Sequence, residues 1–309
     1  MRTVLRFACL LMVVSVSAVT ADAKIIHLLP KPRVITTASG SFSLSQAVRL
    51  QYSDASLEAS ALTRFFESAG AGVTADTSAP LVTITKVTAI DGAEDYALSG
   101  YDNEAYELAV APGSITIKAV TKTGVIRAAS TLTQLAEGYD GTPELEACTI
   151  TDWPAFKLRG YMHDVGRSFI DVNELKKEID LLSRFKVNTF HWHLTDNQGF
   201  RFESKLYPAL NASSSMTRYA GQYYTQAQCQ EVEAYAKERG ITIIPEIDMP
   251  GHSTAFTTAM GHTMASTTGQ AELVNIIGEL AAAFPEAPHL HLGFDESSVT
   301  LSTLITLST

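Results

Sequence analysis

Two adjacent carboxylates, Asp295 and Glu296, close a short apolar stretch of the chain, residues 289–294. An apolar run of this length after a proline-containing turn indicates a strand buried on both faces, as in parallel sheets. Charged side chains rarely stand beside a core unless they are paired or take part in chemistry, and carboxyl groups suit general acid and base catalysis. Because side chains alternate along a strand, both acids can enter one pocket only if the strand has ended by Glu296. The alternative is a strand end with two solvated acids.

Three earlier apolar segments also carry polar side chains at one end. The first is followed by Asp164 and Arg167, the second by His191, His193 and Asp196, and the third by Glu246, Asp248 and His252. Taken singly, each could be structural, because a histidine within a strand is more often a satisfied core residue than a ligand. Four such groups at the same end of four strands indicate a functional site at that rim.

The elements that must position these groups alternate between strand and helix from Trp153 onward. Strands are predicted at residues 158–165, 187–194, 241–247 and 289–294. Helices are predicted to begin at Asp171 and Thr225, each followed by a capping partner three positions later, and a further helix carries an apolar face from Leu273 to Phe284. Such units in series imply a parallel sheet with right-handed crossovers. Long loops after the second and third strands favour the rim of a barrel over a doubly wound sheet.

The predicted fold is therefore α/β. It comprises a partial (β/α)8 TIM barrel of about four βα units over residues 152–309, preceded by a smaller α+β domain over residues 24–151. The smaller domain alternates strand-like pieces with two helix candidates, residues 56–68 and 124–135. It contains no obvious catalytic cluster, so the chemistry is assigned to the second half of the chain.

The N-terminus has the pattern of a secretory signal peptide over residues 1–23. Two arginines precede a short apolar segment, and Ala21-Asp22-Ala23 offers a small-x-small cleavage site. We therefore expect a secreted or exported chain, in an extracellular, periplasmic or lysosome-like compartment. Only Cys148 and Cys229 would remain, so no disulfide framework holds the fold, and the sequence leaves open whether these two pair.

Without residues 1–23 the chain has 21 basic and 32 acidic residues, a net charge of −11. An acidic surface argues against nucleic acid and against an anionic membrane as partners, since both are recognised through clustered lysine and arginine. The composition, 46% hydrophobic and 18% charged, is that of a soluble globular protein.

Four motifs carry a resemblance to a known family. They are Leu-Arg-Gly through Asp-Val-Gly-Arg at 158–167, His-Trp-His-Leu-Thr-Asp at 191–196, Pro-Glu-Ile-Asp-Met-Pro-Gly-His at 245–252 and His-Leu-Gly-Phe-Asp-Glu at 291–296. In order and approximate spacing they resemble the β-N-acetylhexosaminidases of glycoside hydrolase family 20. The resemblance spans residues 153–296, and the preceding α+β segment is similar to that family's N-terminal domain. Together the motifs are specific, whereas the last one alone is moderately so.

The resemblance implies a retaining, substrate-assisted hydrolysis of terminal, non-reducing β-linked N-acetylglucosamine or N-acetylgalactosamine, without cofactor or metal. Glu296 would be the general acid and base, which requires a pKa raised by burial or by a neighbouring negative charge, and Asp295 would hold the acetamido group. The partner would be an oligosaccharide or glycoconjugate that ends in an N-acetylhexosamine. The implied sugar-binding residues are Arg167, Asp196 and His252, and the implied supporting residues are Asp248, Glu246 and His193.

Two features depart from the family pattern. Phe294 stands where a small residue is usual, and by strand alternation it faces the helical layer. From Leu158 to Thr309 there are 152 residues, whereas a complete eight-stranded barrel needs roughly 250. We therefore expect this chain to be a fragment or short form with little hydrolase activity alone, since a half-barrel exposes two sheet edges and its inner face.

Two alternatives from other classes stay open. His191 and His193, whose rings share one strand face, could bind a metal with His252 and Asp295 in a metal-dependent hydrolase, and loss of activity in a chelator would favour that class. The chain could instead be an inactive sugar-binding or structural remnant, which would bind a thiazoline inhibitor without turning over substrate. The sequence does not decide between glucosamine and galactosamine substrates, nor the oligomeric state.

Overall fold

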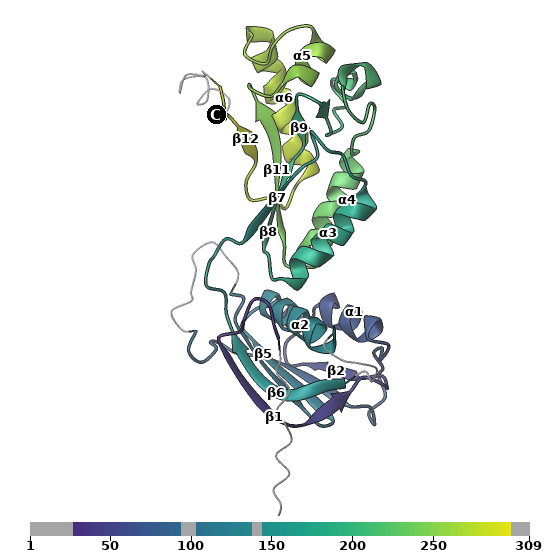
Figure 1. Cartoon of the computed structure of the whole chain (residues 1–309), viewed down its shortest axis with the longest axis vertical. Coiled ribbons are helices and arrows are strands. Elements are labelled where there is room, and N and C mark those ends of the chain that lie inside the picture. The colour runs from purple at the N-terminus through teal and green to yellow at the C-terminus, as the bar shows by residue number, and fades with distance from the viewer. Residues whose placement is uncertain (1–26, 94–102, 138–143, 298–309) are drawn as a thin grey trace, which may run out of the picture.

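The computed structural model describes residues 27–93, 103–137 and 144–297, and these form two regions stacked along the long axis of the molecule (Figure 1). The N-terminal region is a six-stranded sheet with helices against it, and the C-terminal region is built around a four-stranded sheet. The predicted signal peptide lies outside the described residues, and so does most of the tail after Glu296.

A mixed sheet in the order β1-β6-β4-β5-β3-β2 forms the N-terminal region. Its antiparallel pairs are β1–β6, β6–β4 and β4–β5, and its parallel pairs are β5–β3 and β3–β2. Helices α1 (Ser60–Ser68) and α2 (Lys122–Glu137) lie against one face of the sheet (Figure 1). The strands are β1 (Val34–Ser43), β2 (Arg49–Tyr52), β3 (Leu81–Lys86), β4 (Tyr106–Ala111), β5 (Ser114–Ala119) and β6 (Glu144–Asp152).

Alternation of apolar and polar residues decides which face of this sheet receives the helices. Leu108 on β4 and Ile117 on β5 are fully buried in one core with Leu132 of α2. Their neighbours Glu107 and Lys118 point the other way and form an ion pair of 2.7 Å between the two strands. The region is therefore an α+β unit with one buried and one partly solvated sheet face.

The predicted helix over residues 56–68 is interrupted. Asp54 caps a short 3-10 turn, η1 (Ala55–Leu57), through a hydrogen bond from the Ser56 amide, and the α-helix begins only at Ser60. Glu58, with φ −58° and ψ 116°, leaves the helical region between the two pieces. The continuous helix was thus wrong at its first turn, because a local aspartate cap stabilises a separate turn there.

Four parallel strands in the order β12-β11-β8-β7 form the sheet of the C-terminal region. They are β7 (Gly160–Asp164), β8 (Thr189–His193), β11 (Thr242–Met249) and β12 (His291–Gly293), and their ends differ from the predicted ones by one or two residues. The register places Asp164, His193, Glu246 and His291 side by side across all four strands. Polar groups from distant parts of the sequence therefore meet near the carboxyl ends of the strands.

Three helices cover the apolar face of this sheet: α3 (Val172–Arg184), α4 (Gln226–Lys237) and α6 (Thr267–Ala283) (Figure 1). The caps predicted for the first two are confirmed: Asp171 accepts from the amides of Asn173 and Glu174, and Thr225 forms a capping box with Gln228. Within the described ranges, none of the helices is long and apolar enough to cross a membrane.

The loops at the carboxyl ends of β8 and β11 contain short elements that the sequence did not predict. After β8, a tight hairpin pairs β9 (Thr195–Asp196) with β10 (Gly199–Phe200), and the 3-10 turns η3 (Pro208–Asn211) and η4 (Ser213–Ser215) follow. After β11, the short helix α5 (Thr254–Met260) packs against both turns. These elements build the rim on which the candidate site stands.

A buried cluster of charges joins the two regions. Glu104 of the N-terminal region accepts hydrogen bonds from Arg127 Nε, Arg159 Nη2 and Asn188 Nδ2. Arg127 Nη2 also donates to the carbonyl oxygen of Gly240 at 2.7 Å. Because Arg127 belongs to the N-terminal region and Arg159 and Asn188 belong to the C-terminal region, this single carboxylate holds groups from both sides of the junction.

The two cysteines predicted to remain in the mature chain do not form a disulfide with each other. Cys148 on β6 and Cys229 on α4 are both buried and free. Burial raises the pKa of the Cys148 thiol to about 11. Their pairing, left open by the sequence, is therefore excluded in this structure.

Candidate active site

The strand that leads to the paired acids ends before it reaches them. β12 stops at Gly293, and the backbone then turns through positive φ angles at Gly293 (71°), Phe294 (73°) and Glu296 (48°). Phe294 is partly buried and packs against the hydrophobic core of the C-terminal region. The simple alternation of faces is broken at this point, so the two acids are free to turn toward one place.

Asp295 and Glu296 turn toward the same imidazole. His252 Nε2 lies 3.6 Å from Asp295 Oδ2 and 3.2 Å from Glu296 Oε2. His252 follows β11 on the neighbouring loop and has a positive φ of 46°. The side chains of the two acids are 66% and 79% exposed in the part of the chain that the structure describes. The structure therefore brings the pair together but does not enclose it.

Arg167 and Asp196 form the second part of the site. Arg167 Nη2 donates to Asp196 Oδ2 at 2.8 Å, and its Nη1 donates to Asp164 Oδ2 at 2.6 Å. The Asp196 side chain is fully buried; burial alone would raise its pKa, but hydrogen bonds and the nearby Arg167 charge lower it. A Cβ on Gly166 would lie only 2.8 Å from Asp196 Cβ, so this glycine permits the loop of Arg167 to touch the loop of Asp196.

His193 links this ion pair to the sheet. Its Nδ1 lies 2.6 Å from Glu246 Oε2, and its Nε2 lies 3.2 Å from Asp196 Oδ2. Burial disfavours the charged ring, but the hydrogen bonds to Asp196 and Glu246 outweigh it and raise the pKa of His193 to about 10. At neutral pH the ring is therefore an imidazolium that donates from both nitrogens.

Glu246 is a buried anion held by three imidazoles. His191 Nε2 approaches its Oε2 at 2.7 Å and His291 Nδ1 approaches its Oε1 at 2.8 Å, in addition to His193. Burial alone would raise the pKa of Glu246, but these hydrogen bonds hold it well below its usual range. Glu246 thus stays ionised and fixes the rings on the polar face of the sheet.

Asp248 differs from every other acid of the cluster. It is only 1% exposed, and neither carboxylate oxygen has a hydrogen-bond partner among the described residues. Burial, followed by the negative charges of Asp295 and Glu246, raises the pKa of Asp248 to about 7. One carboxylate oxygen of Asp196, one of Asp248 and one ring nitrogen of His252 all lie within 4.8 Å of one another. Asp248 therefore connects the Arg167–Asp196 pair to His252 and its two acids, and all eight predicted site residues meet in one cluster.

The metal set weighed from the sequence is not assembled. His191 and His193 both contact Glu246, but His252 contacts Asp295 and Glu296 instead. Among the described residues, a cation could be approached by other sets of three, such as His191, Glu246 and His291, whose donor atoms lie within 4.8 Å of one another. None of these sets of three combines His191 and His193 with His252 and Asp295, and the metal-dependent alternative stays a prediction.

Comparison with known families accounts for almost the whole described chain. Residues 26–153 match the family described as "Glycosyl hydrolase family 20, domain 2", and residues 156–276 match "Glycosyl hydrolase family 20, catalytic domain". The chain belongs to glycoside hydrolase family 20. The matched part ends before Asp295 and Glu296, so the roles of these two residues stay a prediction.

Individual family 20 proteins are similar over the same span. A β-hexosaminidase of Vibrio furnissii is 32% identical over 89% of this chain and 49% of its own length. A crystal structure of an exo-β-N-acetylglucosaminidase from Vibrio harveyi, in complex with N-acetylglucosamine, has a TM-score of 0.75 and 30% identity over 87% of this chain and 47% of that one. The structure of the β-N-acetylhexosaminidase of Bacteroides fragilis has a TM-score of 0.74 and 28% identity, and the match covers 91% of this chain and 59% of that one. The chain spans about half the length of these relatives.

Two rim residues of this family 20 chain were not found from its sequence. Asn197 Oδ1 accepts from the amide and the hydroxyl of Thr254, which ties the β9–β10 hairpin to α5. Arg201 is fully buried beneath the same hairpin. The sequence does contain a signal for Arg201, because it is a single charged residue between Phe200 and Phe202. A charge inside an apolar segment needs polar partners when it is buried.

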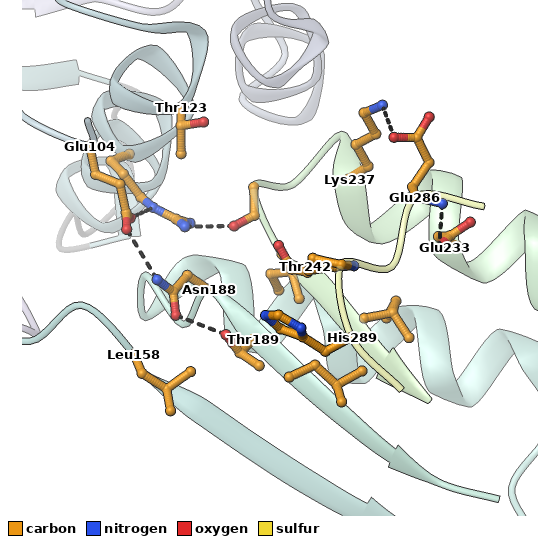
Figure 2. A pocket seen from close by; sticks show the side chains of 16 residues that line it. Glu104, Thr123, Leu158, Asn188, Thr189, Glu233, Lys237, Thr242, Glu286 and His289 are labelled. Carbon is orange, nitrogen blue, oxygen red and sulfur yellow. Dashed lines mark hydrogen bonds and ion pairs between the residues drawn. The ribbon is translucent and has the colours of Figure 1, made fainter. Parts of the chain in front are cut away.

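A cavity of about 550 Å³ lies away from this cluster, at the amino ends of the strands (Figure 2). Its lining includes Glu104, Asn188, Thr242 and His289, but none of the eight predicted site residues. Figure 2 shows Lys237 and Glu286 as an ion pair of 2.8 Å, and Glu233 accepts a hydrogen bond from the backbone amide of Glu286. The rim cluster, rather than this cavity, therefore carries the candidate chemistry.

Proposed function

We propose that this chain acts as a β-N-acetylhexosaminidase that removes terminal, non-reducing β-linked N-acetylglucosamine or N-acetylgalactosamine. The observation that carries the proposal is the convergence of Asp295 and Glu296 on His252, with Asp248 connecting them to the Arg167–Asp196 pair. The Vibrio harveyi relative was crystallised with N-acetylglucosamine, which supports this substrate class. The substrate would be an oligosaccharide or glycoconjugate that ends in such a sugar.

The proposed reaction needs no nucleophile from the protein. Glu296 gives its proton to the glycosidic oxygen while the acetamido carbonyl oxygen of the substrate attacks the anomeric carbon, so one C–O bond forms as the other breaks. Asp295, ionised, accepts the acetamido N–H and stabilises the positive charge of the oxazolinium-like intermediate. Glu296 then takes a proton from water, which attacks the anomeric carbon and restores the acetamide with retained configuration.

The other residues of the cluster would bind the sugar or hold the acids. The Arg167 guanidinium and the Asp196 carboxylate are suited to neighbouring sugar hydroxyls. His252, in contact with both acids, would orient Glu296 and share its proton. Asp248, Glu246 and His193 would fix these groups from the sheet.

We also propose that the C-terminal region is the first half of a (β/α)8 barrel. Four parallel strands, helices against their apolar face and polar groups at their carboxyl ends support this arrangement. Its inner face would carry His191, His193 and Glu246. The signal-like pattern of residues 1–23 supports the further proposal that the protein is exported.

The test uses two substrates that depend differently on the acid. Diacetylchitobiose has a poor leaving group and needs protonation by Glu296, whereas a nitrophenyl N-acetylglucosaminide has a good one. We expect Glu296→Gln to reduce chitobiose hydrolysis much more than nitrophenyl glycoside hydrolysis, and Asp295→Asn to weaken binding of a thiazoline that mimics the intermediate. Glu286→Gln, at the opposite end of the strands, is the matched control. Equal chitobiose rates for wild type and Glu296→Gln would overturn the assignment.

A second candidate function is sugar binding without turnover. It is favoured by the exposure of the two acids, 66% and 79%, because acid catalysis is most effective in a site from which water is excluded. Thiazoline binding by wild type with no release of product from either substrate would select this second candidate. Absence of both binding and turnover would contradict both functions.

A further inference from the structure

We propose that Arg201 is a positioning residue of the sugar-binding rim. Its guanidinium joins the backbone just before Arg167 to the loop of residues 216–222, and so fixes the distance between these two segments. The proposal rests on the proposed function for its sugar-binding consequence, but its structural part stands on contacts alone. Arg201 is 0% exposed. It touches neither predicted catalytic acid, so it would act only through the groups that it holds.

One side of the guanidinium binds the segment that immediately follows β7. Arg201 Nε donates to the carbonyl oxygen of Val165 at 3.2 Å, and Nη2 donates to that of Gly166 at 3.2 Å. These two residues immediately precede Arg167, whose own guanidinium pairs with Asp196. The direction in which Arg167 leaves the backbone is therefore set by the two carbonyl groups that Arg201 holds.

The other side of the guanidinium binds the loop that follows η4. Nη2 donates to the carbonyl oxygen of Arg218 at 2.7 Å, and Nη1 donates to those of Tyr219 at 3.0 Å and Gln222 at 2.9 Å. Nη1 also lies 3.0 Å from the sulfur of Met216. Tyr219 has a positive φ of 47°, a conformation that a tyrosine seldom adopts without such support. Arg201 thus stabilises this shape of the loop, together with the hydrogen bonds that the amides of Thr217 and Arg218 donate to the carbonyl oxygen of Gln198.

The acceptors explain why this residue is an arginine. Five backbone carbonyl oxygens and one thioether surround the five N–H groups, so the charge is stabilised by dipoles from two separate segments rather than by a carboxylate. A lysine keeps the charge but presents its donors from a single atom, and it cannot span both segments.

Glycine at position 199 makes room for the guanidinium. A Cβ built there would lie 2.2 Å from Arg201 Cζ, which no side chain can occupy. Gly199 belongs to β10, the partner of β9 on which Asp196 lies. The hairpin that carries Asp196 therefore rests directly on Arg201, and both members of the Arg167–Asp196 pair depend on the same side chain.

The experiment compares Arg201→Lys and Arg201→Met with wild type in the full chain. Amide hydrogen exchange of peptides covering residues 165–167 and 216–222 reports positioning without any substrate. We expect exchange in both segments to rise together by at least tenfold in both variants, with α6 unchanged, and thiazoline affinity to fall at least tenfold. Arg239→Lys, a buried arginine that pairs with Asp180 between α3 and α4, is the matched control and should leave both rim segments unchanged.

The two readouts separate the possible failures. If Arg201→Lys leaves exchange unchanged, or loosens only one of the two segments, Arg201 does not couple them. If both segments loosen while thiazoline affinity stays at the wild-type value, the coupling does not position the sugar site. If wild type itself does not bind the thiazoline, the proposed function fails, and exchange still decides whether Arg201 holds the two segments. Arg201→Lys keeps the charge and decides the question even where Arg201→Met does not fold.

Discussion

The α-carbon of Gly293 packs directly against the carboxylate of Asp248. A Cβ built on Gly293 would lie 1.9 Å from Asp248 Oδ1, and the glycine has a positive φ of 71°. Gly293 is the last residue of β12, two positions before Asp295, and Asp248 lies near the end of the neighbouring strand β11. The buried acid and the strand that presents the proposed catalytic pair therefore fit together only because residue 293 has no side chain.

Gly293→Ala should both destabilise the fold and displace the paired acids. The positive φ disfavours alanine by about 1–2 kcal/mol, and the overlap with Asp248 adds roughly 1–3 kcal/mol. Urea unfolding should show the combined loss, and thiazoline binding should weaken. Gly278→Ala is the control, because Gly278 lies within α6 with nothing within 4 Å of its added methyl group, and it should gain about 0.5–1 kcal/mol. Wild-type stability of Gly293→Ala would refute the packing argument.

Asp248 should make the protein less stable as the pH rises toward neutrality. Its folded-state pKa of about 7 exceeds the ordinary value of 3.8, so between these pH values the folded state keeps a proton that the unfolded state has released. Stability from this group therefore falls as pH rises through that window. Asp248→Asn cannot ionise, and its stability relative to wild type should increase between pH 4 and pH 7 by on the order of 2–4 kcal/mol.

Asp295 provides the internal control for that titration. Its charge is the next cause, after burial, of the raised pKa of Asp248. In an Asp295→Asn background the pH window over which Asp248→Asn gains stability should therefore move to lower pH. Urea unfolding of the four variants at several pH values measures this shift, and an unchanged window would show that the two carboxylates do not interact.

His193 should show a pH dependence of the same direction as Asp248, but in a higher pH window. Its folded-state pKa of about 10 lies above the ordinary value of 6.5, so its contribution is complete below pH 6.5 and is lost as pH rises through 10. His193→Gln leaves Glu246 and Asp196 without their shared cation and should lower the unfolding free energy by about 3–5 kcal/mol at pH 6. The difference in unfolding free energy between His193→Gln and wild type should become smaller as the pH approaches 10. His262→Gln, which breaks the pair with Glu272, should change stability by less than about 1 kcal/mol at each pH.

Periodicity and capping were sufficient to predict the framework of the C-terminal region. The parallel strands lie where apolar runs were found, and Thr225 and Gln228 form the predicted capping box, because these signals are local. The β9–β10 hairpin escaped prediction because strands of two residues have no period. The break before α1 escaped it because a side-chain cap on Asp54 competes with the helix.

The site was predicted less evenly than the framework. Residues at strand ends, such as Asp164, His193 and Glu246, could be grouped because a parallel sheet brings equivalent positions together. Arg201 could not, since its role depends on where carbonyl groups from residues 165–222 fall in space. The exposure of Asp295 and Glu296 could not be predicted either, because what covers a rim is decided by tertiary packing and not by the local motif.

The junction between the two regions offers a final prediction, since it contains a buried and an exposed ion pair of the same kind. Glu104, 3% exposed, balances Arg127 and Arg159, whereas Glu238 and Arg64 pair at 3.1 Å with the glutamate side chain 58% exposed. Glu104→Gln removes the buried carboxylate that both arginines contact and should lower the unfolding free energy by about 3–5 kcal/mol. Glu238→Gln should lower it by less than about 1 kcal/mol. Equal losses in urea unfolding would mean that burial does not set the strength of this junction.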